Sequence, residues 1–389
     1  MRLSLTSLAI GGFGIGMTEF VAMGVLPDIA QSLEISIPDA GHLISAYALG
    51  VVIGAPVLVA FASSYPPRKI LMGLMALFAV GNALSAIVPS YPLLFLARLL
   101  SGLPHGAFFG VGAVAAGRIA QKGKEAQSVA VMFAGLTVAN IIGVPLGTFI
   151  GHTLSWRFTF GIVAFIGVLA MLSIRLWFPD LPSAKNSRVL DDLKILKRLP
   201  IWLIITITAI GTGGLFAWFS YIVPLLTEVS GFSGNAVTFI LMAAGAGMSV
   251  GNIVGARMAD KFSPMHASRW LLLSMTVALM LIPFASQWQV TSVLVTFLVG
   301  AVAFSLVAPL QMMMIKEARG GEMLAAAFSQ AAFNIGNALG AYLGGLPLAA
   351  GYDYTSPQWV GAAMAFTGFV LSLFFAFRKS AAPAPVLAE

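Results

Sequence analysis

Two ionisable residues of opposite charge, Glu19 and Arg98, lie inside long apolar segments of the 389-residue chain. Glu19 is the only one of the 14 Asp and Glu residues that lies well inside such a segment. Holding an ionised side chain in hydrocarbon costs roughly 2.5–3.5 kcal/mol on insertion scales, unless the group is protonated or paired, so a buried carboxyl requires a reason. We interpret Glu19 as a group that binds and releases a proton. The alternative is a structural role, as a neutral hydrogen-bonded carboxyl or as half of an ion pair.

Arg98 is the natural partner of Glu19, because the two residues are predicted to lie at similar depth. Counted inward from Pro27 and Pro92, Glu19 lies ~12 Å deep and Arg98 ~9 Å deep. If their segments are neighbours, an ion pair would favour the ionised form of Glu19, whereas burial would favour the protonated form. A substrate that binds between the two side chains could then exchange with a proton. We therefore assign both residues to proton coupling.

A second group of residues could contact a small molecule at mid-segment depth. His105 follows Arg98 by seven residues, so both project from one face of a helix. A neutral imidazole bonded to a neighbouring helix and a role in substrate binding or proton relay are both open for His105. Amides and aromatic rings would bond a ligand or stack on it, although each alone can equally bond a neighbouring helix. The candidate substrate-binding residues are His105, Asn140, Trp218, Tyr221, Asn334 and Asn337.

The sequence lacks the motifs of enzymes and metal sites. It has no Gly-rich phosphate loop ending in Lys and Ser or Thr, no carboxylate pair and no His cluster. There is no Cys, and the four His are scattered at positions 42, 105, 152 and 266, which excludes disulfides, thiol catalysis and Cys-ligated metals. We expect no enzymatic activity, no cofactor and no metal. The formal charge of +7 is spread over several short flanks, so we expect no nucleic-acid partner.

The elements that must position these residues are transmembrane helices. With 59% hydrophobic and 9% charged residues, the chain has more apolar surface than a soluble fold of this length could bury. Each apolar segment has about 19–28 residues, enough for a helix to cross a hydrocarbon core of ~30 Å. We predict an all-α integral membrane protein with twelve transmembrane helices, over residues 5–27, 40–62, 70–88, 92–117, 126–150, 157–178, 201–227, 235–256, 268–286, 290–315, 321–348 and 357–377.

Lys and Arg residues orient these helices, because basic residues near the ends of spans are retained on the cytoplasmic side. Of the 21 Lys and Arg residues, 19 fall in every second gap between apolar segments. They are Arg2, Arg68, Lys69, Arg118, Lys122, Lys124, Arg175, Lys185, Arg188, Lys194, Lys197, Arg198, Arg257, Lys261, Arg269, Lys316, Arg319, Arg378 and Lys379. Arg157 alone occupies the other gaps, and Arg98 lies inside a span. Both termini are therefore predicted to be cytoplasmic.

The longest polar stretch, residues 179–200, divides the chain into two halves. We predict an N-terminal six-helix bundle over 1–178, a cytoplasmic linker over 179–200, a C-terminal six-helix bundle over 201–378 and a cytoplasmic tail over 379–389. Residues 191–198 carry acids first and bases last, so they form either a short amphipathic helix or a solvated linker. Faint similarity between LGTFIG at 146–151 and LGAYLG at 339–344 suggests a duplication, which would place a site between two bundles near mid-membrane.

Several short motifs resemble those of the major facilitator superfamily. Arg98 begins the run RLLSGLPHG, in which two glycines follow at four-residue spacing, as in the superfamily's fourth-helix motif. Residues 143–148, GVPLGT, resemble the fifth-helix antiporter motif. The runs MTEF, GVLP, PHGAFFG and SWRFTF, which begin at residues 17, 24, 104 and 155, resemble the arabinose efflux permease (AraJ-like) and sugar-efflux branch of the drug/proton antiporter group. This resemblance implies twelve helices, alternating access, and export coupled to proton entry through Glu19 and Arg98.

The cytoplasmic loops depart in part from the family pattern. The loop after the second span, usually Gly-x-Leu-Ala-Asp-Arg-x-Gly-Arg-Arg, keeps a basic pair in Arg68 and Lys69 but has Ser64 in place of the Asp. Its counterpart after the eighth span keeps the acid, as Asp260 followed by Lys261. We hypothesise that these residues form the gate between the bundles and that its contact rests mainly on Asp260. The fifth-helix motif also departs, with Val144 where a Gly usually precedes the Pro.

Together, these features predict a proton-coupled secondary transporter that exports small organic molecules by alternating access in a bacterial cytoplasmic membrane. The expected substrates are sugars, drugs or related amphiphiles, and the expected partners are the substrate, protons and membrane lipids. We expect a monomer. A proton symporter or a uniporter for solute uptake is the alternative. A membrane receptor or assembly subunit that transports nothing is less favoured, because the sequence has no large soluble domain.

Overall fold

The computed structural model describes residues 2–62, 65–121, 125–182, 197–318 and 322–381, and these residues form helices joined by short turns. The first half contains α1 (Arg2–Gly24), α2 (Leu26–Leu33), α3 (Ile37–Ala62), α4 (Pro67–Ile87), α5 (Tyr91–Ile119), α6 (Glu125–Val138), α7 (Val144–Ile150) and α8 (Trp156–Trp177). The second contains α10 (Leu199–Phe219), α11 (Ile222–Pro224), α12 (Gly234–Phe262), α13 (Pro264–Ala285), α14 (Gln289–Ser305), α15 (Val307–Ala318), α16 (Glu322–Ala349) and α17 (Ser356–Ala381). Among the described residues, π-helical turns cover Ala139–Gly143, Gly151–Ser155 and Leu225–Val229.

Ten helical stretches among the described residues are long and apolar enough to cross a membrane. An apolar chain in lipid must satisfy each backbone N–H and C=O within its own segment, so helices follow directly from this composition. One of the ten stretches, Ser128–Trp177, has 50 residues and continues from α6 to α8. This stretch is divided at Ser155, where α8 begins: the Ser155 hydroxyl accepts a hydrogen bond from the Arg157 amide at 3.3 Å and so caps α8.

Glycines allow the closest helix contacts. Gly102 on α5 lies against the backbone of Tyr47 on α3, and Gly50 on α3 lies against the Leu99 carbonyl oxygen on α5. A Cβ at either glycine would overlap main-chain atoms of the facing helix. Small residues matter for helix association in lipid, where close packing takes the place of the hydrophobic effect. The first glycine of the fourth-helix motif therefore has a packing role in the α3–α5 contact.

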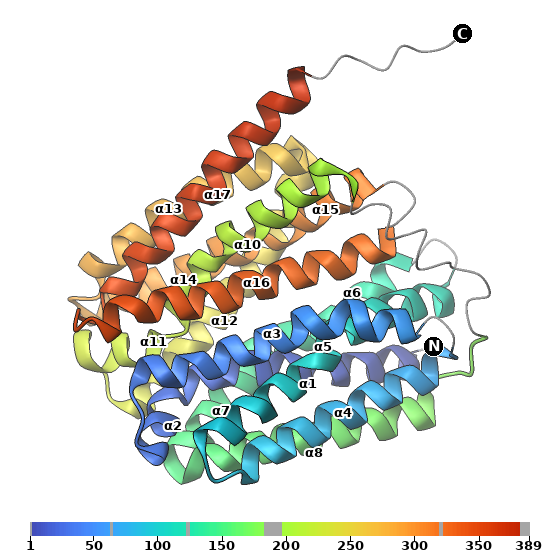
Figure 1. The fold of residues 1–389 in the computed structure, drawn as a ribbon, viewed down its shortest axis with the longest axis horizontal. Coiled ribbons are helices and arrows are strands. Elements are labelled where there is room, and N and C mark those ends of the chain that lie inside the picture. Colours follow the sequence, from blue (N-terminus) through green and yellow to red (C-terminus); the bar gives the residue numbers. More distant parts are fainter. Residues whose placement is uncertain (1, 63–64, 122–124, 183–196, 319–321, 382–389) are drawn as a thin grey trace.

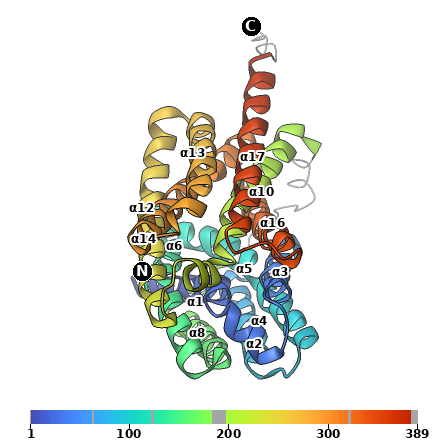
Figure 2. The same cartoon turned by 90° about the vertical axis from the view of Figure 1, so that its left-hand side faces the viewer.

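The two halves of the chain lie beside one another, with most of α1–α8 in the lower part of Figure 1 and most of α10–α17 in the upper part. The 90° view in Figure 2 keeps the same division. Along the boundary, α3 packs against α16, and α12 packs against α7 and the π-helical turn before it. The Ser45 hydroxyl on α3 donates to the Ala338 carbonyl on α16 at 3.0 Å, which fixes one of these contacts.

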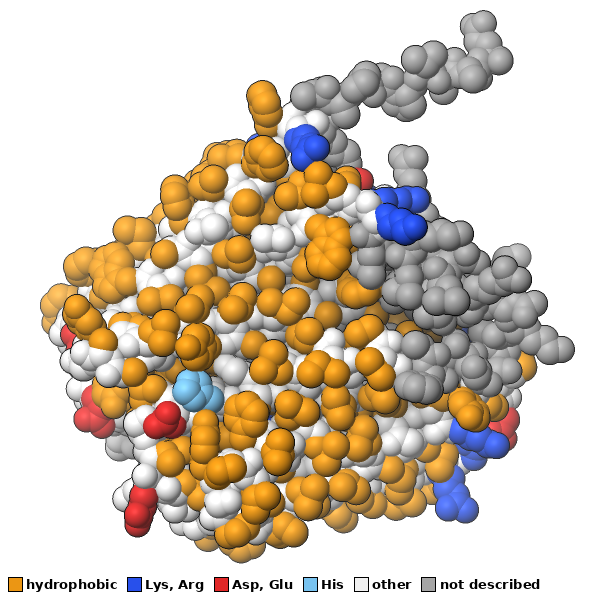
Figure 3. Space-filling model, viewed as in Figure 1, with side chains coloured by type: hydrophobic (Ala, Val, Ile, Leu, Met, Phe, Trp, Pro, Cys, Tyr) orange, Lys and Arg blue, Asp and Glu red, His pale blue; other side chains and the backbone are white. Residues whose placement is uncertain are grey.

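Charged residues separate towards opposite ends of the helices. In Figure 3, most of the visible Lys and Arg side chains lie towards the right-hand end of the molecule, whereas most of the visible Asp and Glu side chains and a His lie towards the left-hand end. We call these the basic end and the acidic end. Arg68, at the start of α4, and Arg175, near the end of α8, belong to the basic end, where the Arg68 guanidinium donates to the Asp180 carboxylate at 2.7 Å and to the Arg175 carbonyl.

Part of the predicted linker is described. The Arg118 guanidinium donates to the Pro182 carbonyl at 3.1 Å, so the first linker residues lie against the end of α5. Residues 183–196, which hold most of the predicted 191–198 helix, lie outside the described residues. Ser64 and the tail from 382 onward lie outside them as well.

Candidate functional site

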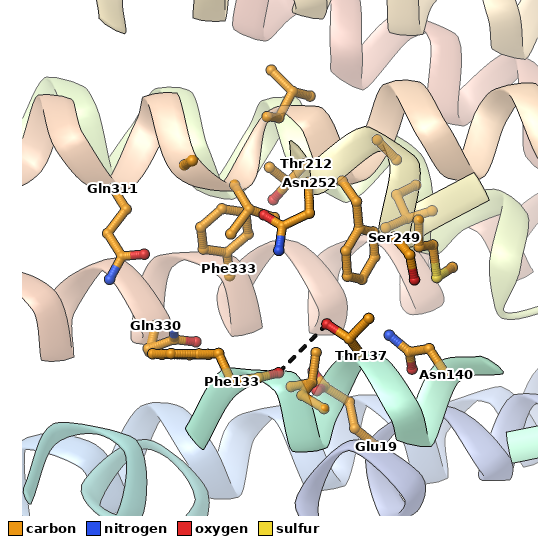
Figure 4. A pocket seen from close by; sticks show the side chains of 18 of the residues that line it. Glu19, Phe133, Thr137, Asn140, Thr212, Ser249, Asn252, Gln311, Gln330 and Phe333 are labelled. Atoms are coloured by element: carbon orange, nitrogen blue, oxygen red, sulfur yellow. Dashed lines mark hydrogen bonds between the residues drawn. The ribbon is translucent and has the colours of Figure 1, made fainter. Parts of the chain in front are cut away.

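A cavity of about 560 Å³ lies between the two halves of the chain. Helices α1, α5 and α6 line it from the first half, and α10 and α12–α16 line it from the second. Figure 4 shows polar side chains from both halves facing one another across it. The polar lining residues are Glu19, His105, Thr137, Asn140, Thr212, Ser249, Asn252, Gln311, Gln330 and Asn334. No Lys or Arg is among the described residues of the lining, whose remaining surface is apolar and rich in Phe and Met.

The cavity extends towards the basic end. Its lining follows α15 to Ile315, one residue before Lys316, and follows α6 back to Val129 near the start of that helix. In the opposite direction the lining stops at Met248 on α12. Beyond this point, the helices of the two halves are in contact. The cavity therefore lies on the basic side of an inter-half contact.

The predicted proton-binding and substrate-binding residues lie in three places relative to the cavity. Glu19, His105, Asn140 and Asn334 line the cavity. Trp218 and Tyr221 are fully buried elsewhere, and the Tyr221 hydroxyl donates to the Ala341 carbonyl at 2.7 Å, which ties the end of α10 to α16. Those two side chains pack helices together and do not reach the cavity. Asn337, the remaining predicted residue, is buried next to the cavity instead of lining it.

Glu19 lies where α1 meets the second half. Its side chain is 7% exposed and lines the cavity, and the Asn337 amide of α16 lies beside its carboxyl group. The next residue, Phe20, packs against rings of the second half, at centroid distances of 6.3 Å to Phe216, 5.9 Å to Phe219 and 6.1 Å to Phe304. The proton-binding candidate thus occupies the boundary between the halves.

Arg98 does not form the expected ion pair with Glu19. Its guanidinium donates to the Thr18 hydroxyl at 3.0 Å and to the Thr18 carbonyl at 3.1 Å, and none of the salt bridges within 4.0 Å among the described residues joins it to Glu19. The Thr18 hydroxyl in turn donates to Asn82 on α4 at 2.5 Å. The rings of Tyr47 and Phe160 lie 4.6 and 5.2 Å from the guanidinium carbon. Arg98 therefore anchors α1 inside the first half, one residue from the carboxyl group.

His105 has a partner that its sequence position did not reveal. A hydrogen bond of 3.0 Å joins its Nδ1 to the Tyr47 hydroxyl, and its ring packs edge-on against Phe109. Because Nδ1 is occupied, Nε2 is the ring nitrogen left for a ligand in the cavity that His105 lines. Tyr47 thus links the cavity wall to Arg98, whose guanidinium lies over the Tyr47 ring.

Two amides of the cavity wall leave hydrogen-bond acceptors free. Asn140 is 4% exposed and Asn334 is 2% exposed, and the Oδ1 atom of each has no hydrogen-bond partner. The Asn334 side-chain nitrogen donates to the Gln330 carbonyl at 3.1 Å, which fixes that side chain. Buried polar atoms normally find partners, so these oxygens are suited to accept hydrogen bonds from a bound molecule. Together with the carboxyl group of Glu19, they make the cavity rich in acceptors.

The inter-half contact beyond the cavity, which we call the outer contact, is formed by close approach at several points. Gly245 on α12 lies against the Asn140 carbonyl, and Gly41 on α3 lies against the Tyr221 hydroxyl. Nearer the acidic end, the His152 ring lies against Gly234, at the start of α12. The Ser45 bond to α16 belongs to the same contact. A Cβ at Gly245 would overlap the backbone of Asn140, so this position holds only glycine while the halves are together.

A carboxylate and an imidazole meet at the acidic end of the outer contact. The His152 Nδ1 atom lies 3.0 Å from Asp28 Oδ1, which joins the π-helical turn before α8 to α2. Partial burial raises the pKa of Asp28 above its ordinary value, and the hydrogen bond to His152 opposes this effect. Asp28 lies outside the membrane-crossing stretches, so solvent protons can reach it.

The predicted gating residues are at the basic end but do not contact one another across the halves. Arg68 bonds Asp180, within the first half and the start of the linker. Lys69, Asp260 and Lys261 are exposed, and the Lys261 ammonium lies 5.1 Å from the Phe262 ring centre. Among the described salt bridges none includes Asp260. The contacts expected of the hypothesised gate are therefore not formed among the described residues.

Several residues of the site gave no signal in the sequence. Phe20 and Tyr47 lie in apolar runs where an aromatic residue is unremarkable, and Thr18 is a small residue common in membrane helices. Asn252, Gln311 and Gln330 are also amides inside predicted spans, so the reasoning that selected Asn140 applies to them equally. Attention to every intramembrane amide would have found these three.

Comparison with known proteins agrees with this geometry. The family model described as Major Facilitator Superfamily matches residues 8–328, and the chain belongs to this superfamily of membrane transporters, which are not enzymes. The transporter AraJ of Escherichia coli is 42% identical over 100% of this chain and 99% of its own length. The inner membrane transport protein YdhP of E. coli is 40% identical, with 96% of each chain covered. A solved structure of the xylose transporter XylE from E. coli, described as partially occluded and inward open, matches with a TM-score of 0.75 over 100% of this chain and 99% of that one, at 14% identity, which shows the fold alone.

Proposed function

We propose that this protein is a proton-coupled exporter of small organic molecules, and that Glu19 carries the exchanged proton. The observation that supports this proposal most directly is the position of Glu19, a buried carboxyl group on the wall of a cavity between the halves. A proton and a substrate that occupy the same cavity can exclude each other there, which is the physical basis of exchange. Resemblance to the drug/proton antiporter group favours export over uptake.

The chain crosses a bacterial inner membrane twelve times in this proposal, with both termini in the cytoplasm. A helix of 50 residues would be ~75 Å long, far more than one ~30 Å crossing, so Ser128–Trp177 supplies two crossings joined near Ser155. The 28-residue α16 supplies one more. With the other nine stretches, the total becomes twelve. The basic end then faces the cytoplasm, in agreement with the distribution of Lys and Arg.

This orientation makes the described arrangement inward-facing. The cavity extends to the basic, cytoplasmic end, and the outer contact lies between it and the outside. Two bundles, one from each half of the chain, would rock about the cavity so that the outer contact opens as the gate with Asp260 closes. The protein would work as a monomer, because each chain holds a complete cavity.

The lining suggests the chemistry of the substrate. Aromatic rings and Met side chains would contact an apolar body, and the free oxygens of Asn140 and Asn334 would accept hydrogen bonds from its hydroxyl or amino groups. Sugars, drugs and related amphiphiles with donor groups fit this description. Anionic molecules do not, because no described Lys or Arg lines the cavity to balance their charge.

Purified protein in proteoliposomes would test the function. A substrate found by thermal-shift screening should leave the cytoplasmic side against its gradient when a proton gradient is imposed, and the Glu19→Gln variant should lose proton uptake and gradient-driven flux together. Wild-type flux in that variant would remove Glu19 from coupling. Accumulation of solute in the direction of proton entry would instead indicate a symporter, and flux that ignores the proton gradient would indicate a uniporter. Absence of flux for every molecule that binds would indicate a receptor.

A further inference from the structure

The buried side chain of Asn337 has no hydrogen-bond partner for either of its polar atoms. The residue is fully enclosed, and neither Nδ2 nor Oδ1 makes a hydrogen bond of standard geometry, although the side chain lies within reach of the Glu19 carboxyl group. Native proteins seldom leave both ends of a buried amide unpaired. A group that bonds Asn337 in another state of the protein would explain this exception, and Glu19 is the neighbouring group whose hydrogen-bonding capacity changes with protonation.

Asn337 and Glu19 are each fixed to a different half of the molecule. On α16, Gly336 lies against the Ala209 carbonyl of α10, and the Ala338 carbonyl accepts the Ser45 hydroxyl of the outer contact. On α1, the residue before Glu19 is Thr18, which Arg98 holds inside the first half. A bond between Asn337 and Glu19 would therefore join the halves next to the outer contact, and its loss would release them.

We propose that Asn337 is a positioning residue that senses the protonation state of Glu19 across the boundary and so links proton binding to closure of the outer contact. This inference rests on the proposed function, because it takes Glu19 as the proton carrier. It adds the residue through which the second half responds to the proton.

The hydrogen-bonding capacity of the two groups gives the direction of the effect. When Glu19 takes a proton from water in the cavity, its O–H can donate to Asn337 Oδ1 while Asn337 Nδ2 donates to the carboxyl oxygen, which makes two bonds. When the proton leaves, only the bond from Nδ2 is possible, and Oδ1 faces a carboxylate that cannot donate. Protonation therefore adds one bond between the halves and favours a closed outer contact. An exporter that takes its proton from outside requires this order.

Other titratable groups near Glu19 belong to the first half alone. They are Arg98 and His105 on α5 and Tyr47 on α3. The faces of α10, α14 and α16 that line the cavity contribute no titratable side chain among the described residues. A response of the second half to the proton on Glu19 must therefore pass through an uncharged group, and Asn337 is suited to that role.

The absence of Cys in the chain allows a direct test of outer closure. A single Cys introduced as Ser45→Cys reports opening of the outer contact when a membrane-impermeant maleimide is added from outside. Its labelling rate at pH 5.5 and pH 8.5 is divided by that of an exposed reporter, Gln287→Cys, which corrects for thiol chemistry. We expect the corrected rate to be about 2- to 10-fold higher at pH 8.5, as the loss of one hydrogen bond predicts.

The same ratio is then measured in variants. Glu19→Gln and Asn337→Ala should each bring it to about one. Ser329→Ala changes another buried side chain of α16 that has no hydrogen-bond partner but does not line the cavity, and it should keep the wild-type ratio. A wild-type ratio in Asn337→Ala together with a ratio of one in Glu19→Gln would overturn the role of Asn337 and leave the proposed function intact. A wild-type ratio in Glu19→Gln would count against the proposed function itself. If Asn337→Ala does not fold, Asn337→Leu, of similar volume and without hydrogen bonds, replaces it.

Discussion

Replacing Thr18 by Val tests whether Arg98 anchors α1. The side chains have nearly the same shape, so the substitution removes the hydroxyl and little else. It removes the 3.0 Å bond that the Arg98 guanidinium donates and the 2.5 Å bond that Asn82 accepts. The 3.1 Å bond from Arg98 to the Thr18 carbonyl involves the main chain and should remain.

The expected loss of stability follows from these two bonds. A hydrogen bond to a charged group contributes about 1.5–3 kcal/mol and a neutral one about 0.5–1.5 kcal/mol, so Thr18→Val should lower the free energy of unfolding by about 2–4.5 kcal/mol. The upper part of this range is favoured, because Arg98 Nε already lacks a partner and the buried charge would lose a further acceptor. Thr18→Ser keeps the hydroxyl and should lose only about 0.8 kcal/mol, the contribution of one buried methyl group.

Unfolding of the purified protein in mixed micelles with increasing SDS, followed by circular dichroism, would measure both variants. A double-mutant cycle with Arg98→Met should give a coupling energy of at least about 1.5 kcal/mol, because removing both partners leaves no unpaired charge. Equal stability of Thr18→Val and Thr18→Ser would refute the anchoring role, as would additive effects in the cycle. Arg98 would then have to be held by its aromatic neighbours.

Three further outcomes are expected. Gly102→Val should abolish stable expression in the membrane, because the valine side chain would overlap the α3 backbone. Gly73→Ala is the control: open space surrounds the added Cβ, so this variant should stabilise the protein by about 0.5–1 kcal/mol. Equal expression of Gly102→Val and wild type would contradict the described packing. Burial raises the pKa of Asp28, so its contribution to stability is complete below the unfolded value of about 3.9 and is lost as the pH rises through the folded pKa. The melting temperature of Asp28→Asn should therefore rise relative to wild type as the pH increases above about 4, and a constant difference would disprove this linkage. Gly245→Leu should hold the outer contact open and so raise external labelling of a Cys introduced at Ser45. Unchanged labelling would show that α12 does not pack against the first half at this position.

The helices were predictable because hydrocarbon leaves an apolar chain no other way to satisfy its backbone. Their interruptions were not. Residues 201–227 read as one span, yet α10 ends at Phe219 and a short helix starts at Ile222. The Tyr221 hydroxyl lies between α16 and Gly41 of α3 at this point, so the interruption coincides with contacts to distant residues that hydropathy does not record.

The sequence predicted which residues belong to the site better than it predicted which residues they contact. Burial of one carboxyl group marked Glu19, and the same argument found His105 and two amides of the cavity. The pairing of Glu19 with Arg98 failed because counting residues gives depth along a helix but not direction around it. Successive residues of an α-helix point about 100° apart, and at nearly the same depth it is Thr18 that faces α5.

This one-residue difference has a mechanical consequence. Thr18 points into the first half, where Arg98 and Asn82 hold it, while Glu19 and Phe20 point towards the second half. Because α1 is tied at Thr18, it cannot turn freely when Glu19 gains or loses a proton. The adjustment must instead occur in the residues of the second half that face Glu19 and Phe20. A proton held by one half can thereby move the other, which alternating access requires and which an ion pair between Glu19 and Arg98, contained within the first half, would not provide.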